Sequence, residues 1–373
     1  MKEKHKSISS RFKAHLSIKD GYKGGKSIPT KKNQKTYKLS SNENPIGPSP
    51  KAVEAIQQHA QQVHIYPDTT DIRLREALEI YYNNQLRRDQ FVCASSGSEL
   101  IDIIIRGFVN EGDEVIISSP YFVAYKMFAA WSGAKVVDIP LREESNYELD
   151  VKGIINAVND RTRIIFLTSP NNPTGTYIPK ATLEVLLAQI PADVVVILDE
   201  VYWHFTTKED YTIALPYLSD YQNLVAINSF SKTYGLAALR VGYAYMNEEI
   251  ANYLRQLCRP FLIGKLSMEG ALGALKDADF INQTVQLVTQ ERAFLHKQFE
   301  ALNIKFTPSQ ANFILIDPPI PSGEFVDFLR ERGISVRPVD NFGAPGKVRI
   351  SIGNIGANKA LIGAIKQMKA VKT

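Results

Sequence analysis

Seven short runs of apolar residues, each bounded by turn residues, constrain the fold of this 373-residue chain most strongly. The runs are continuous and do not alternate with polar residues, so we expect strands that are buried on both faces. Helical patterns separate most of the runs, and this alternation is typical of a parallel sheet covered by helices. The sequence therefore predicts an α/β fold with a large, doubly wound, mostly parallel seven-stranded sheet. The runs lie at residues 90–96, 113–120, 134–141, 163–170, 194–200, 223–231 and 241–246.

The pattern changes after about residue 262. A long amphipathic stretch at 267–302 is followed by a strand, a helix and two short strands, which together predict a smaller α+β domain. We therefore divide the chain into three parts. These are a basic N-terminal arm (1–44), a large α/β domain (45–262) and a small C-terminal α+β domain (263–373).

The N-terminal arm is strongly basic. Residues 1–38 hold eleven Lys and one Arg against Glu3 and Asp20, whereas the whole chain has a net charge of only +5. A basic arm can bind nucleic acid, but no helical basic stripe accompanies it, and we favour a solvated, partly disordered tail. No apolar run approaches the roughly 20 residues that a membrane helix needs. We expect neither a nucleic-acid partner nor a membrane partner.

The cysteines and histidines narrow the class of protein further. Cys93 and Cys258 are far apart in sequence and belong to no CxxC pair, which suits a reducing, cytoplasmic environment. The basic N-terminus lacks the apolar region of a secretory signal. The six histidines have no zinc-ligand spacing. We expect a cytoplasmic protein with no metal site.

Polar and aromatic residues follow five of the predicted strands. In open α/β sheets, ligands bind beyond the carboxyl ends of the strands. Each segment alone is a weak indication, but together the five predict one pocket. The segments are SSGSE (95–99), PY (120–121), SPNNPTG (169–175), DEVY (199–202) and SFSK (229–232).

Charged residues in and after these segments indicate the chemistry. A desolvated lysine loses its proton more readily and becomes a nucleophile able to form a Schiff base, which makes Lys232 a candidate. Asp199 ends an apolar strand and needs a partner, either a protonated ring nitrogen of a ligand or a neighbouring Arg or Lys. Arg240 suits a phosphate, as does the turn at 96–98, unless that turn is an ordinary cap formed by Ser98. Pyridoxal 5'-phosphate (PLP) would use all of these groups.

In order and spacing, these segments resemble the class I/II aminotransferases of PLP fold-type I, and specifically the histidinol-phosphate aminotransferase branch. The likeness covers nearly the whole chain from about residue 22. It implies a homodimer with a shared active site. It also implies a small-molecule amino donor, with L-histidinol phosphate preferred, and a 2-oxo acid acceptor, with 2-oxoglutarate expected. The likeness also rests on KLSSNENPIGPSP (38–50), YPD (66–68), SFSKTYGLAALRVGY (229–243) and VRISIG (348–353).

The resemblance assigns roles to individual residues. Lys232 would carry the Schiff base and move a proton, and Asp199 would keep the pyridine nitrogen protonated, with Tyr202 as a third catalytic residue. Arg349 would bind the carboxylate of the substrate. Arg337 would lie beside Arg349, unless Arg337 is a surface charge. The remaining contacts would be Gly97, Ser98, Glu99 (backbone), Tyr121 (ring stacking), Asn172, Tyr202, Ser229, Ser231, Arg240 and the neighbouring subunit's Tyr66 for the cofactor, with Asn172 and Tyr22 also near the substrate.

Related functions stay open on the same scaffold. Transamination of aromatic amino acids and decarboxylation of threonine phosphate use similar motifs and the same cofactor. A transcription regulator with a PLP domain would need a helix-turn-helix module, for which the 38-residue leader is too short.

Overall fold

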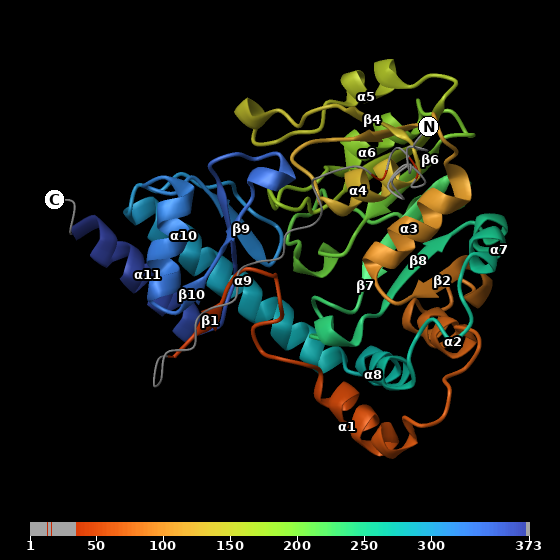
Figure 1. Cartoon of the computed structure of the whole chain (residues 1–373), viewed down its shortest axis with the longest axis horizontal. Helices are drawn as coiled ribbons and strands as arrows, with labels where there is room; N and C mark the ends of the chain where they lie inside the picture. Colours follow the sequence, from red (N-terminus) through yellow and green to blue (C-terminus); the bar gives the residue numbers. More distant parts are fainter. Residues whose placement is uncertain (1–12, 14–15, 17–34, 371–373) are drawn as a thin grey trace, which may run out of the picture.

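The computed structural model describes residues 13, 16 and 35–370 of the chain (Figure 1). Its centre is a seven-stranded sheet in the order β2-β8-β7-β6-β5-β3-β4. Only β8 runs antiparallel to its neighbours β2 and β7, so the predicted doubly wound, mostly parallel sheet is confirmed. The strands are β2 (Phe91–Ala94), β3 (Glu114–Ile117), β4 (Lys135–Asp138), β5 (Thr162–Thr168), β6 (Val195–Asp199), β7 (Leu224–Ser229) and β8 (Gly242–Met246).

Helices cover both faces of this sheet, which is why its strands read as continuous apolar runs. Side chains of α1, α2, α5, α6 and α8 form one core cluster with the sheet, and those of α3, α4 and α7 form another on the opposite side. Strand β4 is the exception, because it lies at an edge and its four residues are all partly or fully exposed. The helices are α1 (Pro50–His59), α2 (Ile72–Tyr81), α3 (Gly97–Phe108), α4 (Ala124–Trp131), α5 (Val151–Ala157), α6 (Lys180–Leu187), α7 (Glu248–Gln256) and α8 (Lys265–Leu275).

The amphipathic stretch at 267–302 is divided between two helices, α8 and α9 (Ala278–Ala301), with Asp277 as the residue before α9. The Asp277 carboxylate accepts hydrogen bonds from the Ser49 hydroxyl and the Lys51 amide at the start of α1. Helices α1 and α8 lie close together at Gly273, where an added Cβ would come 2.5 Å from the Lys51 carbonyl oxygen. Helix α8 therefore packs into the core of the large sheet, although the boundary predicted at 262/263 assigns it to the small domain.

A second core lies around a three-stranded antiparallel sheet in the order β11-β12-β9. Strand β1 (Tyr37–Lys38) pairs in parallel with β10 (Ile334–Ser335), so this short segment near the start of the described chain lies against the C-terminal part (Figure 1). The remaining elements of this part are β9 (Phe313–Ile316), α10 (Ser322–Glu331), β11 (Arg337–Pro338), β12 (Val348–Ser351) and α11 (Ile355–Ala370).

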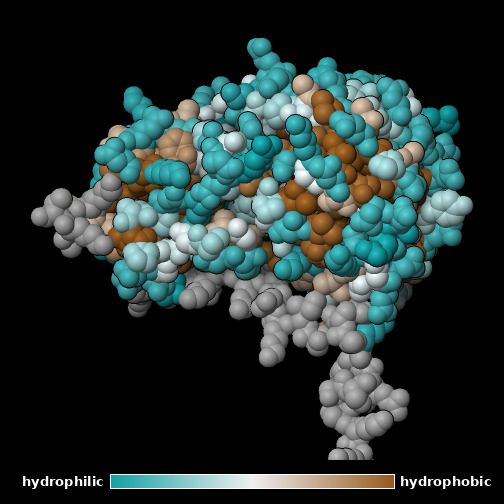
Figure 2. All heavy atoms as spheres, turned by 90° about the horizontal axis from the view of Figure 1, so that it is seen from above, coloured by the Kyte–Doolittle hydropathy of each residue, from teal (hydrophilic) through white to brown (hydrophobic). Residues whose placement is uncertain are grey.

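The molecular surface is mostly hydrophilic on the face shown in Figure 2, with hydrophobic side chains gathered in a few areas. Within the described part of the chain, no helix combines the length and apolar character that crossing a membrane requires.

Candidate active site

A cavity lies where the carboxyl ends of β5, β6 and β7 meet the start of α3 and strand β12. Strands that run in parallel end at the same edge of the sheet, so residues distant in sequence converge there. Ten of the residues singled out in the sequence line this cavity. They are Gly97, Ser98, Asn172, Asp199, Tyr202, Ser229, Ser231, Lys232, Arg240 and Arg349.

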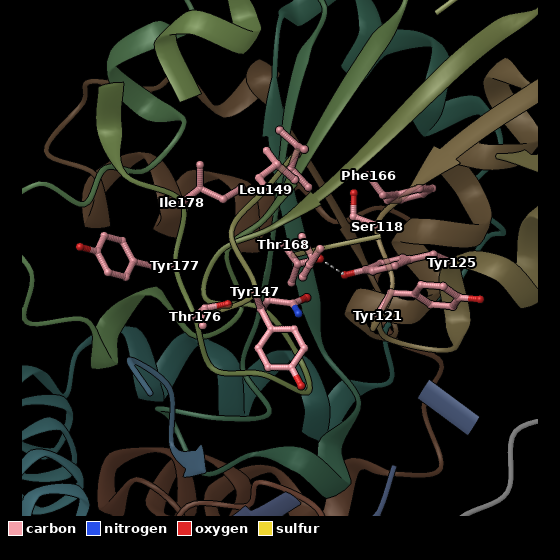
Figure 3. A pocket seen from close by; sticks show the side chains of 13 residues that line it. Ser118, Tyr121, Tyr125, Tyr147, Leu149, Phe166, Thr168, Thr176, Tyr177 and Ile178 are labelled. Atoms are coloured by element: carbon pink, nitrogen blue, oxygen red, sulfur yellow. Dashed lines mark hydrogen bonds between the residues drawn. The ribbon is translucent and has the colours of Figure 1, made fainter. Parts of the chain in front are cut away.

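Tyr121, expected to stack on the cofactor ring, does not line this cavity. It lines a smaller neighbouring cavity instead (Figure 3), and the next residue, Phe122, lines the large one. The Tyr121 amide donates to the Phe342 carbonyl oxygen at 2.9 Å, which fixes the backbone between β3 and α4 in this orientation. The stacking role therefore fits Phe122 better than Tyr121.

The start of α3 is capped by Ser96. Its side-chain oxygen accepts a hydrogen bond from the Glu99 amide at 3.0 Å, so the alternative that Ser98 is the cap is wrong. Ser98 and Gly97 face the cavity instead. The Glu99 side chain points elsewhere and forms an ion pair with Arg259 at 2.9 Å. The Glu99 amide, expected to lie near the phosphate, is thus taken by Ser96, and the Gly97 and Ser98 amides remain at the start of the helix, a position that suits an anion.

Tyr66 lies outside the cavity of its own chain. Its side chain is 79% exposed, and its ring contacts that of Phe261 with centroids 4.9 Å apart. A contribution of Tyr66 to a neighbouring subunit stays a prediction. Tyr22 lies outside the described residues.

Lys232 follows β7, and its Nζ donates to the Ser41 carbonyl oxygen at 3.2 Å. The same nitrogen lies 5.8 Å from the centre of the Tyr202 ring. Burial, together with the nearby Arg349 guanidinium, lowers the pKa of the Lys232 amine to about 8. A much larger fraction of this amine is neutral near pH 7 than for an ordinary lysine, which makes it a better nucleophile.

Asp199 ends β6, and its two carboxylate oxygens have separate partners. One oxygen accepts from the Tyr125 hydroxyl at 2.6 Å, and the other from the Val201 amide at 3.1 Å. Burial raises the pKa of Asp199, and the hydrogen bonds from Tyr125 and Val201 oppose that rise. Among the residues that the structure describes, its hydrogen-bond partners are thus a tyrosine hydroxyl and a backbone amide, and no arginine or lysine donates to it.

Arg337 and Arg349 are both buried, with 4% and 5% exposure, so the alternative that Arg337 is a surface charge is wrong. They pair across β11 and β12 and lie 5.4 and 5.6 Å from the centre of the Phe342 ring. Arg349 lines the cavity and donates to the Asn172 side-chain oxygen, and to the Ser40 carbonyl oxygen at 3.0 Å. Arg337 lies behind it and does not line the cavity.

The cavity is also lined by Ser41, Asn42 and Glu43, which belong to the segment 38–50 and for which the sequence predicted no individual role. The Asn42 side-chain amide donates to the Tyr202 hydroxyl at 3.1 Å, and its backbone amide donates to Ser351 Oγ at 2.7 Å. Asn42 thus ties Tyr202 to β12. The polar run SSNEN (40–44) was the only local indication that these residues lie in the site. The partners of Asn42, Tyr202 and Ser351, are distant in sequence.

The donor set of the cavity fits pyridoxal 5'-phosphate. Lys232 supplies an amine, Asp199 a buried carboxylate, and the start of α3 a set of amides beside Arg240. An added Cβ at Gly97 would lie 3.7 Å from Ile227 and 3.9 Å from Ser229, so a side chain there would fill the space beside the helix start. These residues can hold an aldehyde, a ring nitrogen and a phosphate together.

Fold and site together define an aminotransferase. Residues 34–365 match the family described as aminotransferase class I and II, and the chain belongs to that family. Within it, the chain falls in the histidinol-phosphate aminotransferase branch. A histidinol-phosphate aminotransferase of Bacillus subtilis (strain 168) is 36% identical over 365 residues, which cover 96% of this chain and 99% of the relative.

Two solved structures of the same branch resemble this one. The histidinol-phosphate aminotransferase of Clostridium acetobutylicum has a TM-score of 0.81 and 25% identity, covering 89% of this chain and 99% of the other. That of Sinorhizobium meliloti, in complex with pyridoxal-5'-phosphate, has a TM-score of 0.84 and 22% identity, covering 97% and 100%. At that identity, the second likeness shows the fold alone.

Proposed function

We propose that the protein is a PLP-dependent aminotransferase that moves the amino group of L-histidinol phosphate to a 2-oxo acid, with 2-oxoglutarate as the expected acceptor. The observation that carries this proposal is the meeting of Lys232, Asp199 and the start of α3 in one cavity. The names of the relatives, at 35–36% identity and nearly full length, support the choice of donor.

Each group in the cavity has a task that follows from its chemistry. When bound, PLP supplies an electron sink that stabilises negative charge at the substrate carbon. The neutral Lys232 amine can accept and return a proton there, because its pKa of about 8 lies near working pH. Asp199 carries the negative charge that faces a protonated ring nitrogen.

Phosphate and substrate groups find separate partners. The α3 amides, Ser229, Ser231 and Arg240 line the part of the cavity that suits the cofactor phosphate. Arg349 has a fork of donors for the carboxylate of the acceptor. Arg337 adds a second buried guanidinium next to it, which suits a donor that carries a phosphate.

We also propose that the enzyme works as a homodimer. Val63, Ile65 and Tyr66 are exposed apolar or aromatic residues in consecutive turns after α1. Exposed apolar groups gathered in one area are typical of interfaces. Sedimentation should give a mass about twice the 41.8 kDa of one chain. A fully active monomer would contradict the proposal. The expected cytoplasmic location stays a prediction.

A single-turnover screen tests the function. PLP-loaded protein is mixed separately with histidinol phosphate, tyrosine, glutamate and threonine phosphate, and the cofactor absorbance is followed. Histidinol phosphate and glutamate should each convert the cofactor to its amine form, and histidinol phosphate should do so faster than tyrosine. Faster reaction with tyrosine would indicate an aromatic aminotransferase, and release of CO₂ from threonine phosphate a decarboxylase. Lys232→Ala should abolish the reaction, and the surface variant Lys180→Ala should leave it unchanged.

A further inference from the structure

A tyrosine that the sequence analysis had passed over contacts the buried carboxylate of the site. Tyr125, in the first turn of α4, is 1% exposed and lines both the large cavity and the small one, of which Figure 3 shows the small one. Its hydroxyl donates to Asp199 Oδ2 at 2.6 Å, which is a short, charge-assisted hydrogen bond. The tyrosine therefore acts directly on the group expected to face the cofactor.

The Tyr125 ring is held in one orientation. It stacks on Phe166 with centroids 4.6 Å apart and planes 17° apart, and Phe122 meets it edge-on at 5.9 Å. Both contacts hold the ring in place, and the phenolic oxygen is fixed with it because this oxygen lies on the axis of the ring. The hydroxyl is thus set by packing and does not depend on a ligand.

A third residue completes the arrangement. Thr168 Oγ1 lies 3.0 Å from the Tyr125 hydroxyl oxygen (Figure 3). Thr168 is also the partner of Asp199 in the register of β5 and β6. A phenol has one hydrogen to donate, and Tyr125 uses it for Asp199, so Thr168 is the donor to Tyr125. The sequence of donations runs from Thr168 through Tyr125 to Asp199.

We infer that Tyr125 is a positioning residue that keeps the Asp199 carboxylate ionised and oriented toward the ring nitrogen of the cofactor. The inference rests on the proposed function. A donor to one carboxylate oxygen stabilises the charged form and leaves the rest of the group directed at the cavity. Burial alone raises the pKa of Asp199, and the Tyr125 hydrogen bond lowers it, so loss of the hydroxyl should raise this pKa further.

The titration of Asp199 also depends on its charged and titratable neighbours. Because the test compares variants that leave these neighbours unchanged, their contribution is the same on both sides. They are Glu200 and Tyr211 beyond β6 and Lys232 after β7. Tyr202 and Arg349 contribute through their effects on Tyr125 and Lys232.

The test is cofactor affinity as a function of pH. Full-length protein freed of cofactor is titrated with PLP between pH 5.5 and 8.5, for wild type, Tyr125→Phe and Tyr177→Phe. The Phe variant keeps the packed ring and removes only the hydroxyl. Tyr177 is a matched control, because it lines the same small cavity but donates its hydroxyl to Asp210 at 2.8 Å.

Tyr125→Phe should bind PLP more weakly toward the acidic end of this range, by up to roughly 10- to 150-fold, the expected loss of one hydrogen bond to a charged group. The pH at which affinity falls should move up by about one to two units. Thr168→Val should shift it in the same direction but less. Tyr177→Phe should match wild type.

Two results would overturn the inference. One is a Tyr125→Phe variant with the affinity and pH profile of wild type. The other is a uniform loss at every pH, which a merely structural role would give. If Tyr125→Phe does not fold, Thr168→Val decides, and an unshifted profile refutes the inference. Failure of the wild type to bind PLP would instead refute the proposed function.

Discussion

Arg337 lies directly opposite Arg349 on the neighbouring antiparallel strand, and the two guanidinium groups lie 5.4 and 5.6 Å from the centre of the same Phe342 ring. Residues paired across antiparallel strands project from the same side of a sheet. Two buried guanidinium groups in neighbouring strands make this part of the site electropositive. The pair therefore favours a site that takes up negatively charged substrates.

The first prediction separates the two arginines. Arg349 lines the cavity, so Arg349→Ala should impair all substrates in both kcat and KM. Arg337→Ala removes a buried positive charge next to Arg349, so it should act selectively and lower kcat/KM for histidinol phosphate roughly 10- to 150-fold more than for tyrosine. Steady-state kinetics with both donors check this. Equal effects of Arg337→Ala on both donors, or none, would remove Arg337 from phosphate recognition.

Asp199→Asn should keep the fold and bind PLP, yet transaminate about 10²- to 10⁴-fold more slowly, a loss of about 3–5 kcal/mol in transition-state stabilisation. An amide is neutral and cannot stabilise a protonated ring nitrogen as a carboxylate does. Single-turnover rates with histidinol phosphate provide the measurement, and cofactor absorbance provides the control for loading. Turnover close to wild type would show that Asp199 has no part in the reaction.

The lowered pKa of Lys232 predicts its reactivity as a function of pH. Only the neutral amine reacts with acylating agents. Its reactivity in cofactor-free protein should therefore rise as the pH passes about 8, well below the ordinary value of 10.5. Competitive labelling with acetic anhydride, read by mass spectrometry of the Lys232 peptide, measures the midpoint. The exposed Lys180 in the same digest is the internal reference. A midpoint near 10.5 would contradict the burial of this amine.

The contact of α1 with α8 predicts a contrast between two glycines. Gly273→Ala places a Cβ 2.5 Å from the Lys51 carbonyl oxygen, so it should destabilise the protein by about 1–3 kcal/mol. Gly363→Ala, in α11, meets nothing within 4 Å and should be neutral or stabilising by up to about 1 kcal/mol. Urea denaturation measures both. Equal stability of the two variants would contradict the close approach of these helices.

The sheet was predictable because burial on both faces leaves a continuous apolar run that reads directly from sequence. An apolar run does not show whether its strand lies at the centre or at the edge of the sheet. The run at 134–141 forms β4, which lies at the edge and is half-exposed. The division at 267–302 was missed for a related reason. Asp277, the residue before α9, accepts a hydrogen bond from the Ser49 hydroxyl. Ser49 is 228 positions away, and no local pattern reveals this partner.

Much of the candidate site was predictable from the residues that follow each strand. The direction of neighbouring side chains was not, and the stacking role was assigned to Tyr121, whereas its neighbour Phe122 lines the cavity. Tyr125 lies only three residues after Phe122, and its amide donates to the Phe122 carbonyl oxygen at 3.2 Å in the turn that leads into α4. Its partnership with Asp199, however, joins α4 to β6 and depends on the tertiary fold.

The most direct test of the account asks where the cofactor attaches. PLP-loaded protein is reduced with borohydride, digested and mapped by mass spectrometry, with Lys232→Ala treated in parallel. The account predicts one phosphopyridoxyl group per chain, on Lys232, and none at that site in the variant. An adduct on another lysine of the wild type, or no adduct after loading, would contradict the assignment of this cavity as the active site.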